Sequence, residues 1–178
     1  THTGTVSDLS TLGNARNDQH VSIFPCRKFL STPWQVAGAL GAVVAVHMQD
    51  APELSRPLHT LPLVGIKGPR TKSNHLTKTD RQTLYYDGIS GYHIRRDGTV
   101  CIDRIVTTYQ SNAWGDPDWT YLDIETMAQS MYYVRSLRTE TTSKHGRQAL
   151  AMSNPGNLPH IVTPLDLEAT LDHNYLKN

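Results

Sequence analysis

The sequence has few of the features that point to chemistry or to a strongly charged partner. It holds 2 cysteines among 178 residues, and aromatic residues make up 7% of it. Its 17 lysines and arginines nearly balance its 16 aspartates and glutamates, which leaves a formal charge of +1. A chain with this balance has no overall electrostatic attraction for nucleic acid, for an anionic membrane or for an acidic substrate. The sequence therefore predicts neither a nucleic-acid nor a membrane partner.

Long hydrophobic runs are also lacking. The longest one, residues 36–46, is interrupted by glycine and is too short to cross a bilayer core of about 30 Å. The N-terminal stretch lacks the apolar segment of a signal peptide. Cys26 and Cys101 stand alone without CxxC spacing, so two reduced, buried thiols are favoured over a disulfide.

Catalytic and metal-binding spacings are missing as well. The histidines are scattered, without HxH, HxxxH or HExxH, so no metal ligands are predicted. Neither GxGxxG, GxxxxGK[ST] nor GxSxG occurs, which leaves no candidate for cofactor-binding or catalytic residues. Three acidic residues, Asp116, Asp118 and Asp123, precede or open a predicted helix. They are interpreted as turn and capping residues, with a cation site as the alternative.

Four threonine-led capping boxes predict where helices begin. We expect helices near 33–49, 78–86, 119–140 and 164–177, opened respectively by Thr32-x-x-Gln35, Thr77-x-x-Asp80, Thr120-x-x-Asp123 and Thr163-x-x-Asp166. In the third helix an apolar stripe recurs at spacings of three and four, and it consists of Ile124, Met127, Met131, Val134 and Leu137.

Strand patterns lie between these helices. β-rich runs flank Asp97-Gly98, which predicts an antiparallel hairpin over 89–107 with a type I′ turn. Residues 20–24 and 105–109 also have the composition of strands, and 60–66 suits an edge strand because it contains proline. Strands that alternate with helices predict an α/β layered domain with a mixed sheet covered by helices. We expect a loose N-terminal segment over 1–17 and a single α/β domain over 18–178.

A family resemblance rests on several short segments. The most specific stretch, residues 105–144, contains IVTTYQSNA, DWTYLDI, YVRSLR and TSK, while RPLHTL at 56–61, LYYDGIS at 84–90 and IVTP at 161–164 extend it. Over roughly residues 30 to 170 the chain resembles the tail sheath proteins of Mu-like contractile phages and prophages. It departs from them at 152–160, where MSNPGNLPH replaces a glycine-rich segment, and it is truncated at both ends relative to a complete sheath protein.

The resemblance implies a structural protein and not an enzyme. A sheath subunit polymerises around the tail tube and contracts to drive the tube through the host envelope. Its implied partners are other sheath subunits in helical or hexameric rings, the tail tube protein, and the baseplate and tail terminator proteins, with no cofactor. Its implied location is the virion, after assembly in the host cytoplasm. The alternative function is an uncharacterised α/β enzyme or small-ligand-binding domain that uses the histidines and aspartates.

One basic segment is a candidate for contact between subunits. Between residues 67 and 81 the positive side chains are Lys67, Arg70, Lys72, Lys78 and Arg81. A solvated surface loop is one interpretation of this run, and contact with an acidic surface of a neighbouring subunit is the functional one. Binding of nucleic acid is a third and weaker alternative, because the segment lacks an aromatic stacking platform.

Overall fold

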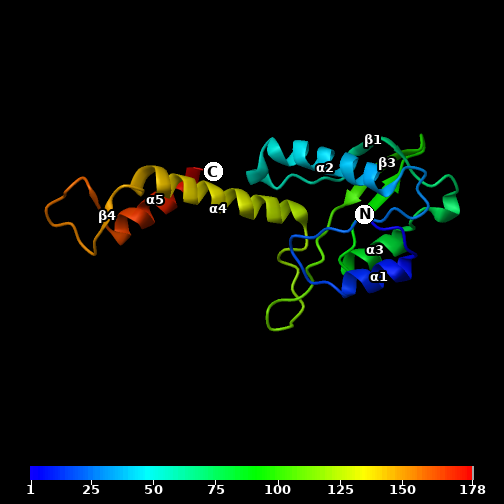
Figure 1. Cartoon of the computed structure of the whole chain (residues 1–178), viewed down its shortest axis with the longest axis horizontal. Helices are drawn as coiled ribbons and strands as arrows, with labels where there is room; N and C mark the ends of the chain where they lie inside the picture. Colours follow the sequence, from blue (N-terminus) through cyan, green and yellow to red (C-terminus); the bar gives the residue numbers. More distant parts are fainter. Residues whose placement is uncertain (178) are drawn as a thin grey trace. The chain divides into compact units, whose positions relative to one another are not determined.

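The computed structural model describes residues 1–177. Contacts between residues divide the chain into two compact units, Thr1–Ala128 (unit 1) and Gln129–Asn178 (unit 2). This differs from the single domain expected over 18–178. Figure 1 shows the elements of each unit along the chain. Within the described part of the chain, no helix is both long and apolar enough to cross a membrane.

Unit 1 is built around a three-stranded antiparallel sheet. Its strands are β1 (Pro62–Lys67), β2 (Gly91–Ile94) and β3 (Thr99–Arg104), in the order β1-β3-β2. The central strand β3 is apolar at consecutive positions, and Val100, Cys101 and Ile102 are all fully buried. β1 lies at an edge, as its proline predicts, and its register to β3 is irregular between Pro62 and Lys67.

The hairpin over 89–107 is confirmed, but its turn is not type I′. A type I′ turn needs a positive φ at both central residues. Here Gly98 has φ +87°, whereas Asp97 is not among the residues with positive φ. The Gly98 N–H donates to the Arg95 carbonyl (3.0 Å), and the Arg95 N–H donates to the Thr99 carbonyl (2.9 Å). This is a three-residue loop that ends in a glycine bulge.

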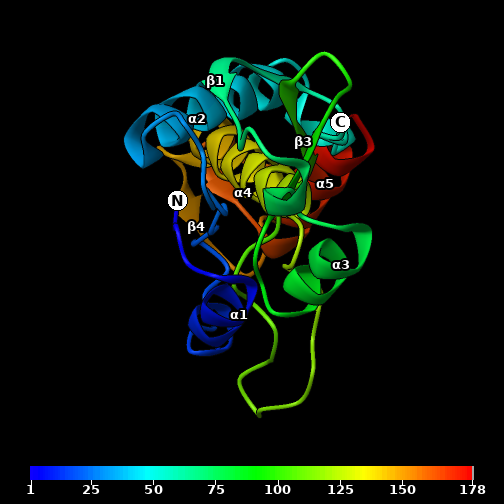
Figure 2. The same cartoon turned by 90° about the vertical axis from the view of Figure 1, so that its right-hand side faces the viewer.

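Three helices surround the sheet of unit 1, and they are α1 (Val6–Asn14), α2 (Pro33–Gln49) and α3 (Lys78–Tyr86). α2 and α3 begin where their capping boxes predict, at Thr32 and Thr77. α2 contacts β1, while α3 contacts β2 and also α1. Figure 2 shows α1 and α3 below the sheet and α2 beside it. Two short 3₁₀ turns, Pro52–Leu54 and Lys72–Asn74, lie in the connections.

The N-terminal segment 1–17 is not loose, because it contains α1. Thr5 and Asp8 form a complete capping box at its start. Its last turn is fixed to the end of α3, where the Ser10 hydroxyl and the Asn14 amide both donate to the Asp87 carboxylate. Leu9 is fully buried on the same face. The expectation of a loose terminus is therefore wrong.

The segment before α4 (Ile124–His145) also differs from the prediction. β3 ends at Arg104, and residues 105–109 do not extend the strand. The Thr120-x-x-Asp123 capping box is wrong, because Asp123 accepts two hydrogen bonds from the Arg104 guanidinium, at 2.7 and 2.8 Å. The Thr120 hydroxyl instead donates to Asp118 (2.6 Å). The helix begins at Ile124, five residues after the predicted start at 119, and it extends past residue 140 to His145. Residues 20–24 likewise form only one isolated bridge, between Ile23 and Ile89.

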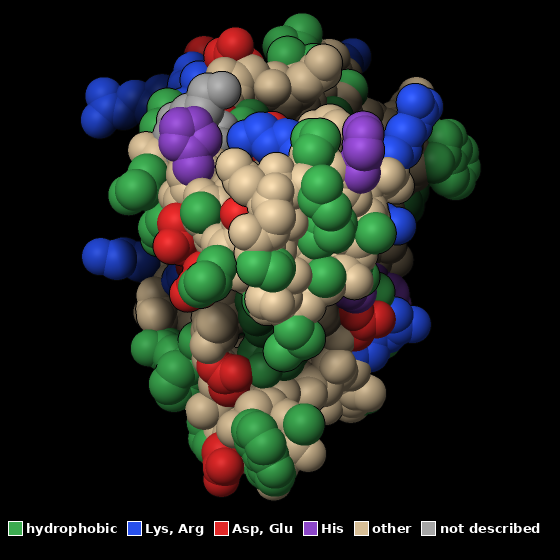
Figure 3. Space-filling model, turned by 90° about the vertical axis from the view of Figure 1, so that its left-hand side faces the viewer, with side chains coloured by type: hydrophobic (Ala, Val, Ile, Leu, Met, Phe, Trp, Pro, Cys, Tyr) green, Lys and Arg blue, Asp and Glu red, His purple; other side chains and the backbone are tan. Residues whose placement is uncertain are grey.

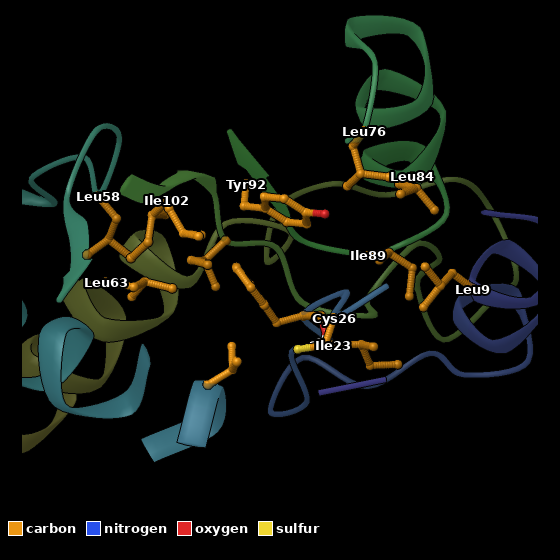
Figure 4. Close-up of a cluster of buried hydrophobic side chains, with 14 residues drawn as sticks. Leu9, Ile23, Cys26, Leu58, Leu63, Leu76, Leu84, Ile89, Tyr92 and Ile102 are labelled. Carbon is orange, nitrogen blue, oxygen red and sulfur yellow. Dashed lines mark hydrogen bonds between the residues drawn. The ribbon is translucent and has the colours of Figure 1, made fainter. Parts of the chain in front are cut away.

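Apolar side chains from all of these elements meet in one core. Figure 4 shows side chains from α1, α3, the sheet and the 20–26 segment pointing toward one another. Phe29 contacts Tyr92 edge-on, with ring centroids 4.9 Å apart. Both cysteines are free and buried, as expected. Burial of this kind is the main stabilising contribution to a small domain.

Unit 2 consists of most of α4, a small parallel sheet and α5 (Pro164–Lys177). The sheet pairs β4 (Ala149–Leu150) with β5 (Ile161–Val162). α5 begins at the Thr163 box, as predicted. Hydrophobic side chains reach the molecular surface in the view of Figure 3. Unit 1 combines helices with an antiparallel sheet, and unit 2 combines helices with a parallel pair of strands. This mixture of helices and sheets confirms the predicted α/β fold class.

Candidate functional site

Four of the five basic residues proposed for contact between subunits lie at the surface. Lys67 ends β1, Arg70 and Lys72 lie in the connection that follows, and Lys78 opens α3. All four side chains are exposed. The Lys67 backbone is fixed to the segment before α2, since its N–H donates to the Ser31 hydroxyl (2.9 Å). The basic connection therefore begins from a well-anchored point.

Arg81 differs from these four because its guanidinium is used within the chain. Its Nε lies 3.4 Å from Oδ2 of Asp103, and its side chain is 20% exposed. Its Nη1 donates to the Tyr92 carbonyl (3.3 Å). The pairing joins α3 to the sheet, so the structure places Arg81 in the framework of unit 1.

A concave basic surface forms around Arg70 and Lys72. The depression has a volume of about 630 Å³, and its lining also includes His75 and, from the hairpin turn, Arg95 and Arg96. The register of the sheet explains this meeting, because Lys67 lies opposite Thr99. Residues that follow Lys67 consequently face residues that precede Thr99. We call Arg70, Lys72, Arg95 and Arg96 the basic groove.

The sequence reasoning missed Arg95 and Arg96. They are far from the 67–81 segment along the chain, and their presence in the groove depends on the pairing of β1 with β3. The available signal was the Arg-Arg pair beside Asp97-Gly98, because residues of a hairpin turn project from the end of a sheet. Arg95 is partly tied down, since its Nη2 donates to the Thr60 carbonyl (2.8 Å).

A second polar cluster surrounds Asp103 on β3. Its carboxylate accepts a hydrogen bond from the Tyr85 hydroxyl (2.5 Å) and lies 3.4 Å from Nδ1 of His59 and 3.7 Å from Nδ1 of His93. Burial, followed by the bond to Asp103, raises the pKa of Tyr85. Burial lowers the pKa of His93, although Asp103 opposes this shift. Through these contacts Asp103 joins α3, β2 and β3.

A cavity of about 370 Å³ opens beside this cluster. It is lined by Ser55, Pro57, His59, Asp103, Arg104, Asp123, Glu125 and Thr126. Glu125 Oε1 accepts the Leu58 N–H (3.1 Å), whereas Oε2 is buried without a hydrogen-bond partner in the described chain. Burial raises the pKa of Glu125. The Arg104 guanidinium is held by Asp123 and lies over the Tyr85 ring.

The chemistry available in these surfaces is ionic and hydrogen-bonding. Among the described residues, no group of three His, Cys, Asp or Glu side chains could hold a metal ion. Burial raises the pKa of the Cys26 thiol to about 11, so it is protonated at neutral pH. The polar residues around Asp103 are paired with one another, which suits structural joining of elements.

Comparison with known proteins points in the same direction as the resemblance. No family model matches this chain. The chain is 32% identical over 165 residues to the Mu-like prophage FluMu tail sheath protein of Haemophilus influenzae. The match covers 90% of this chain and 33% of the relative, so the chain spans about a third of the length of the curated relative that it matches. The resemblance to the tail sheath proteins of Mu-like phages and prophages is therefore confirmed over most of this chain.

Proposed function

We propose that this chain is part of a structural subunit of a contractile phage tail sheath. The observation that carries the proposal is its 32% identity to a prophage tail sheath protein along 90% of its own length. In this function the full-length protein polymerises around a tail tube, and contraction of the polymer drives the tube through the host envelope. Its partners are other sheath subunits, the tube, the baseplate and the terminator. It acts in the virion after assembly in the host cytoplasm.

The charge distribution of unit 1 supports a subunit that makes ionic contacts with its neighbours. The chain is nearly neutral overall, yet Arg70, Lys72, Arg95 and Arg96 gather around one depression. A local basic surface on a neutral protein favours an acidic partner surface and fixes its orientation. Such contacts are also readily exchanged, because exposed ion pairs contribute little free energy each. Exchangeable contacts are what a polymer that rearranges on contraction requires.

Electron microscopy of the full-length protein tests the proposed function. We expect the purified protein to form tubular polymers, either extended or contracted, in the absence of other tail proteins. Failure to form tubes or rings at any salt concentration, together with turnover of a small-molecule substrate, would favour the enzyme alternative. Residues 1–178 expressed alone serve as a comparison, and we expect them to be monomeric or weakly associated in sedimentation velocity.

The basic groove has its own test in the same assay. Reversing two of its charges, Arg70→Glu with Lys72→Glu, should weaken assembly of the full-length protein and reduce its dependence on salt concentration. Lys67→Glu with Lys78→Glu is the matched control, because it changes the net charge by the same amount at two exposed residues that do not line the groove. Equal effects of the double variant and the control would show that net charge, and not the groove, controls assembly.

A further inference from the structure

An exposed tryptophan stands at the tip of a rigid loop in unit 1. Trp114 is 87% exposed, the highest value of the three tryptophans in the chain. It lies between Tyr109 and the start of α4, in the loop that extends from unit 1 in Figures 1 and 2. A large aromatic side chain gains nothing for the fold of its own chain when it is left in water. Its placement therefore calls for an explanation outside the packing of unit 1.

The tip of this loop is held by hydrogen bonds. Oδ1 of Asn112 accepts from the backbone N–H groups of Trp114 (2.9 Å) and Asp116 (3.0 Å). The Asn112 N–H donates to the Asp116 carbonyl (3.0 Å), which closes the turn on itself. Gly115 adopts φ +88°, a conformation that glycine tolerates. The backbone that carries Trp114 is thus fixed by local contacts.

The base of the loop is equally well fixed. Asn17 accepts from the N–H groups of Gln110 (2.8 Å) and Ser111 (3.1 Å), and its amide donates to the Ser111 carbonyl (2.8 Å). The Tyr109 hydroxyl donates to Asp118 (2.6 Å) across the two arms. A side chain presented on a rigid support loses little conformational entropy on binding, which is the property of an interface anchor.

An open apolar groove lies on the other side of unit 1. It has a volume of about 420 Å³, and it is lined by Ala42, Val43, Val46, His47, Leu61 and Pro62. These residues come from α2 and from the start of β1. α2 carries no Lys, Arg, Asp or Glu along its 17 residues, and small residues dominate its exposed face. An aromatic side chain can approach such a helix closely, because alanine and glycine leave its surface shallow.

Loop and groove cannot meet within one molecule. In both Figure 1 and Figure 2 the loop extends from the side of unit 1 that is opposite α2. When an apolar projection on one side of a molecule binds an apolar hollow on the other side of the next copy, the contact is head-to-tail and propagates as a ring or a helical filament. This is the class of contact that the proposed sheath function requires.

We propose that Trp114 of one copy inserts into the α2–β1 groove of the next copy of this chain. The inference rests on the proposed function, which supplies the high local concentration of copies. A single tryptophan buries about 150–250 Å², far less than the roughly 1,200 Å² of a stable interface. The contact therefore adds specificity to an assembly that other contacts also hold, and residues 1–178 alone associate only weakly.

Cross-linking of the full-length protein tests the contact directly. Trp114 is replaced by a photo-reactive phenylalanine analogue, and this protein is mixed with isotopically labelled wild-type protein so that links between copies are recognised by mass. We expect links to peptides of α2 and of the start of β1 in the other copy. Links that map reproducibly to any other surface, or only within one copy, would overturn the proposal.

Assembly of variants gives a second readout. Trp114→Ala and Ala42→Arg should each raise the concentration needed for assembly by about tenfold or more, as removal of an interface anchor does. Trp34→Ala and Ala37→Arg are the matched controls, because both sites are exposed on α2 but neither lines the groove. Circular dichroism confirms that each variant is folded.

The outcomes separate this inference from the proposed function. If the wild-type protein forms tubes and both variants form them at the wild-type concentration, the Trp114 contact is wrong and the sheath function stands. If the wild type forms no tubes under any condition, the sheath function fails, and specific links between Trp114 and the groove would then show self-association of another kind.

Discussion

Units 1 and 2 differ in the kind of side chain that they bury. Unit 1 encloses apolar side chains from three helices and a sheet, among them Leu58, Leu84 and Ile102 at 0% exposure. Among the described residues of unit 2, the buried side chains are Val162, Thr170 and Asn174. Most of the energy that stabilises a small domain comes from apolar burial. Unit 1 is therefore expected to be the more stable body.

Several large apolar residues of unit 2 are exposed instead. Exposed members of α4 and α5 include Met131, Val134, Leu165, Tyr175 and Leu176. In α4 two of the five residues of the expected apolar stripe, Met131 and Val134, are more than half exposed, whereas Met127 is buried. Periodicity identifies which residues share a helix face, but not whether a neighbour covers that face.

The largest predicted effect removes a side chain from the core of unit 1. Ile102→Ala, in the central strand, should destabilise unit 1 by about 2–5 kcal/mol, since it loses buried area and leaves a cavity. Tryptophan fluorescence during urea unfolding measures this, because Trp34, Trp114 and Trp119 all lie in unit 1. Val64→Ala, at an 81% exposed position of β1, is the control and should have little effect. A similar shift for both variants would show that the sheet face, and not the core, stabilises unit 1.

The second prediction concerns the polar interior of unit 2. The Thr170 hydroxyl donates to the Asp166 carbonyl (2.9 Å) and lies 2.9 Å from Nε2 of His145. Thr170→Val should destabilise unit 2 by about 1–3 kcal/mol, because it leaves a partly buried ring nitrogen without that partner. The change should appear in the helical circular dichroism signal and leave tryptophan fluorescence unchanged. Thr139→Val, at an exposed position of α4, is the control. A parallel shift of both signals would contradict two separately stabilised units.

These contrasts show how much the sequence alone could predict. The boxes at Thr32, Thr77 and Thr163 gave correct helix starts, because a capping box acts within four residues and needs no distant partner. The box at Thr120 failed because Arg104, distant in sequence, holds the Asp123 carboxylate. The start of α1 was missed although Thr5-x-x-Asp8 carries the same signal, since the polar composition around it suggested a loose terminus.

The strand expected over 105–109 failed for a different reason. Ile105, Val106, Thr107 and Thr108 are buried, which is what their β-branched composition indicates. Their backbone groups bond to separate segments, however: the Thr107 N–H donates to the Leu122 carbonyl and the Thr108 N–H to the Val21 carbonyl. Composition therefore predicted burial correctly and pairing wrongly. The sequence also identified only two of the four residues of the basic groove, Arg70 and Lys72. Arg95 and Arg96 were missed because only the register of the sheet brings them to Arg70.

The third prediction tests the hairpin at the edge of the basic groove. Gly98 has φ +87°, and a Cβ there would meet no atom within 4 Å, so any cost is backbone strain. Gly98→Val should destabilise unit 1 by about 1 kcal/mol or more, because a β-branched residue resists positive φ. Gly98→Asn should cost less, since asparagine tolerates this conformation. Equal urea midpoints for the two variants would contradict a strained glycine position.

The smallest effect uses pH to separate the units, because two carboxyl groups are shifted in opposite directions. Burial raises the pKa of Glu125 in unit 1, whereas the backbone and hydroxyl of Thr163 lower the pKa of Asp166 in unit 2. A raised carboxyl pKa means that the folded state binds the proton more tightly than the unfolded state. The Glu125 contribution therefore favours unit 1 below the ordinary carboxyl pKa and is lost as pH rises through the raised value.

Asp166 has the opposite sign. Its contribution is present above the ordinary carboxyl pKa and is lost as pH falls through the lowered value. Glu125→Gln should accordingly stabilise unit 1 at neutral pH and lose this advantage in mild acid, when followed by tryptophan fluorescence. Asp166→Asn should weaken unit 2 at neutral pH and approach the wild type only in stronger acid, when followed by circular dichroism. Comparison of each variant with the wild type at every pH removes the contributions of the other titrating groups, such as Asp8, Asp97 and Asp118, whose pKa values are also lowered. If both variants shifted stability in the same direction at neutral pH, the two carboxyl groups would not have opposite roles.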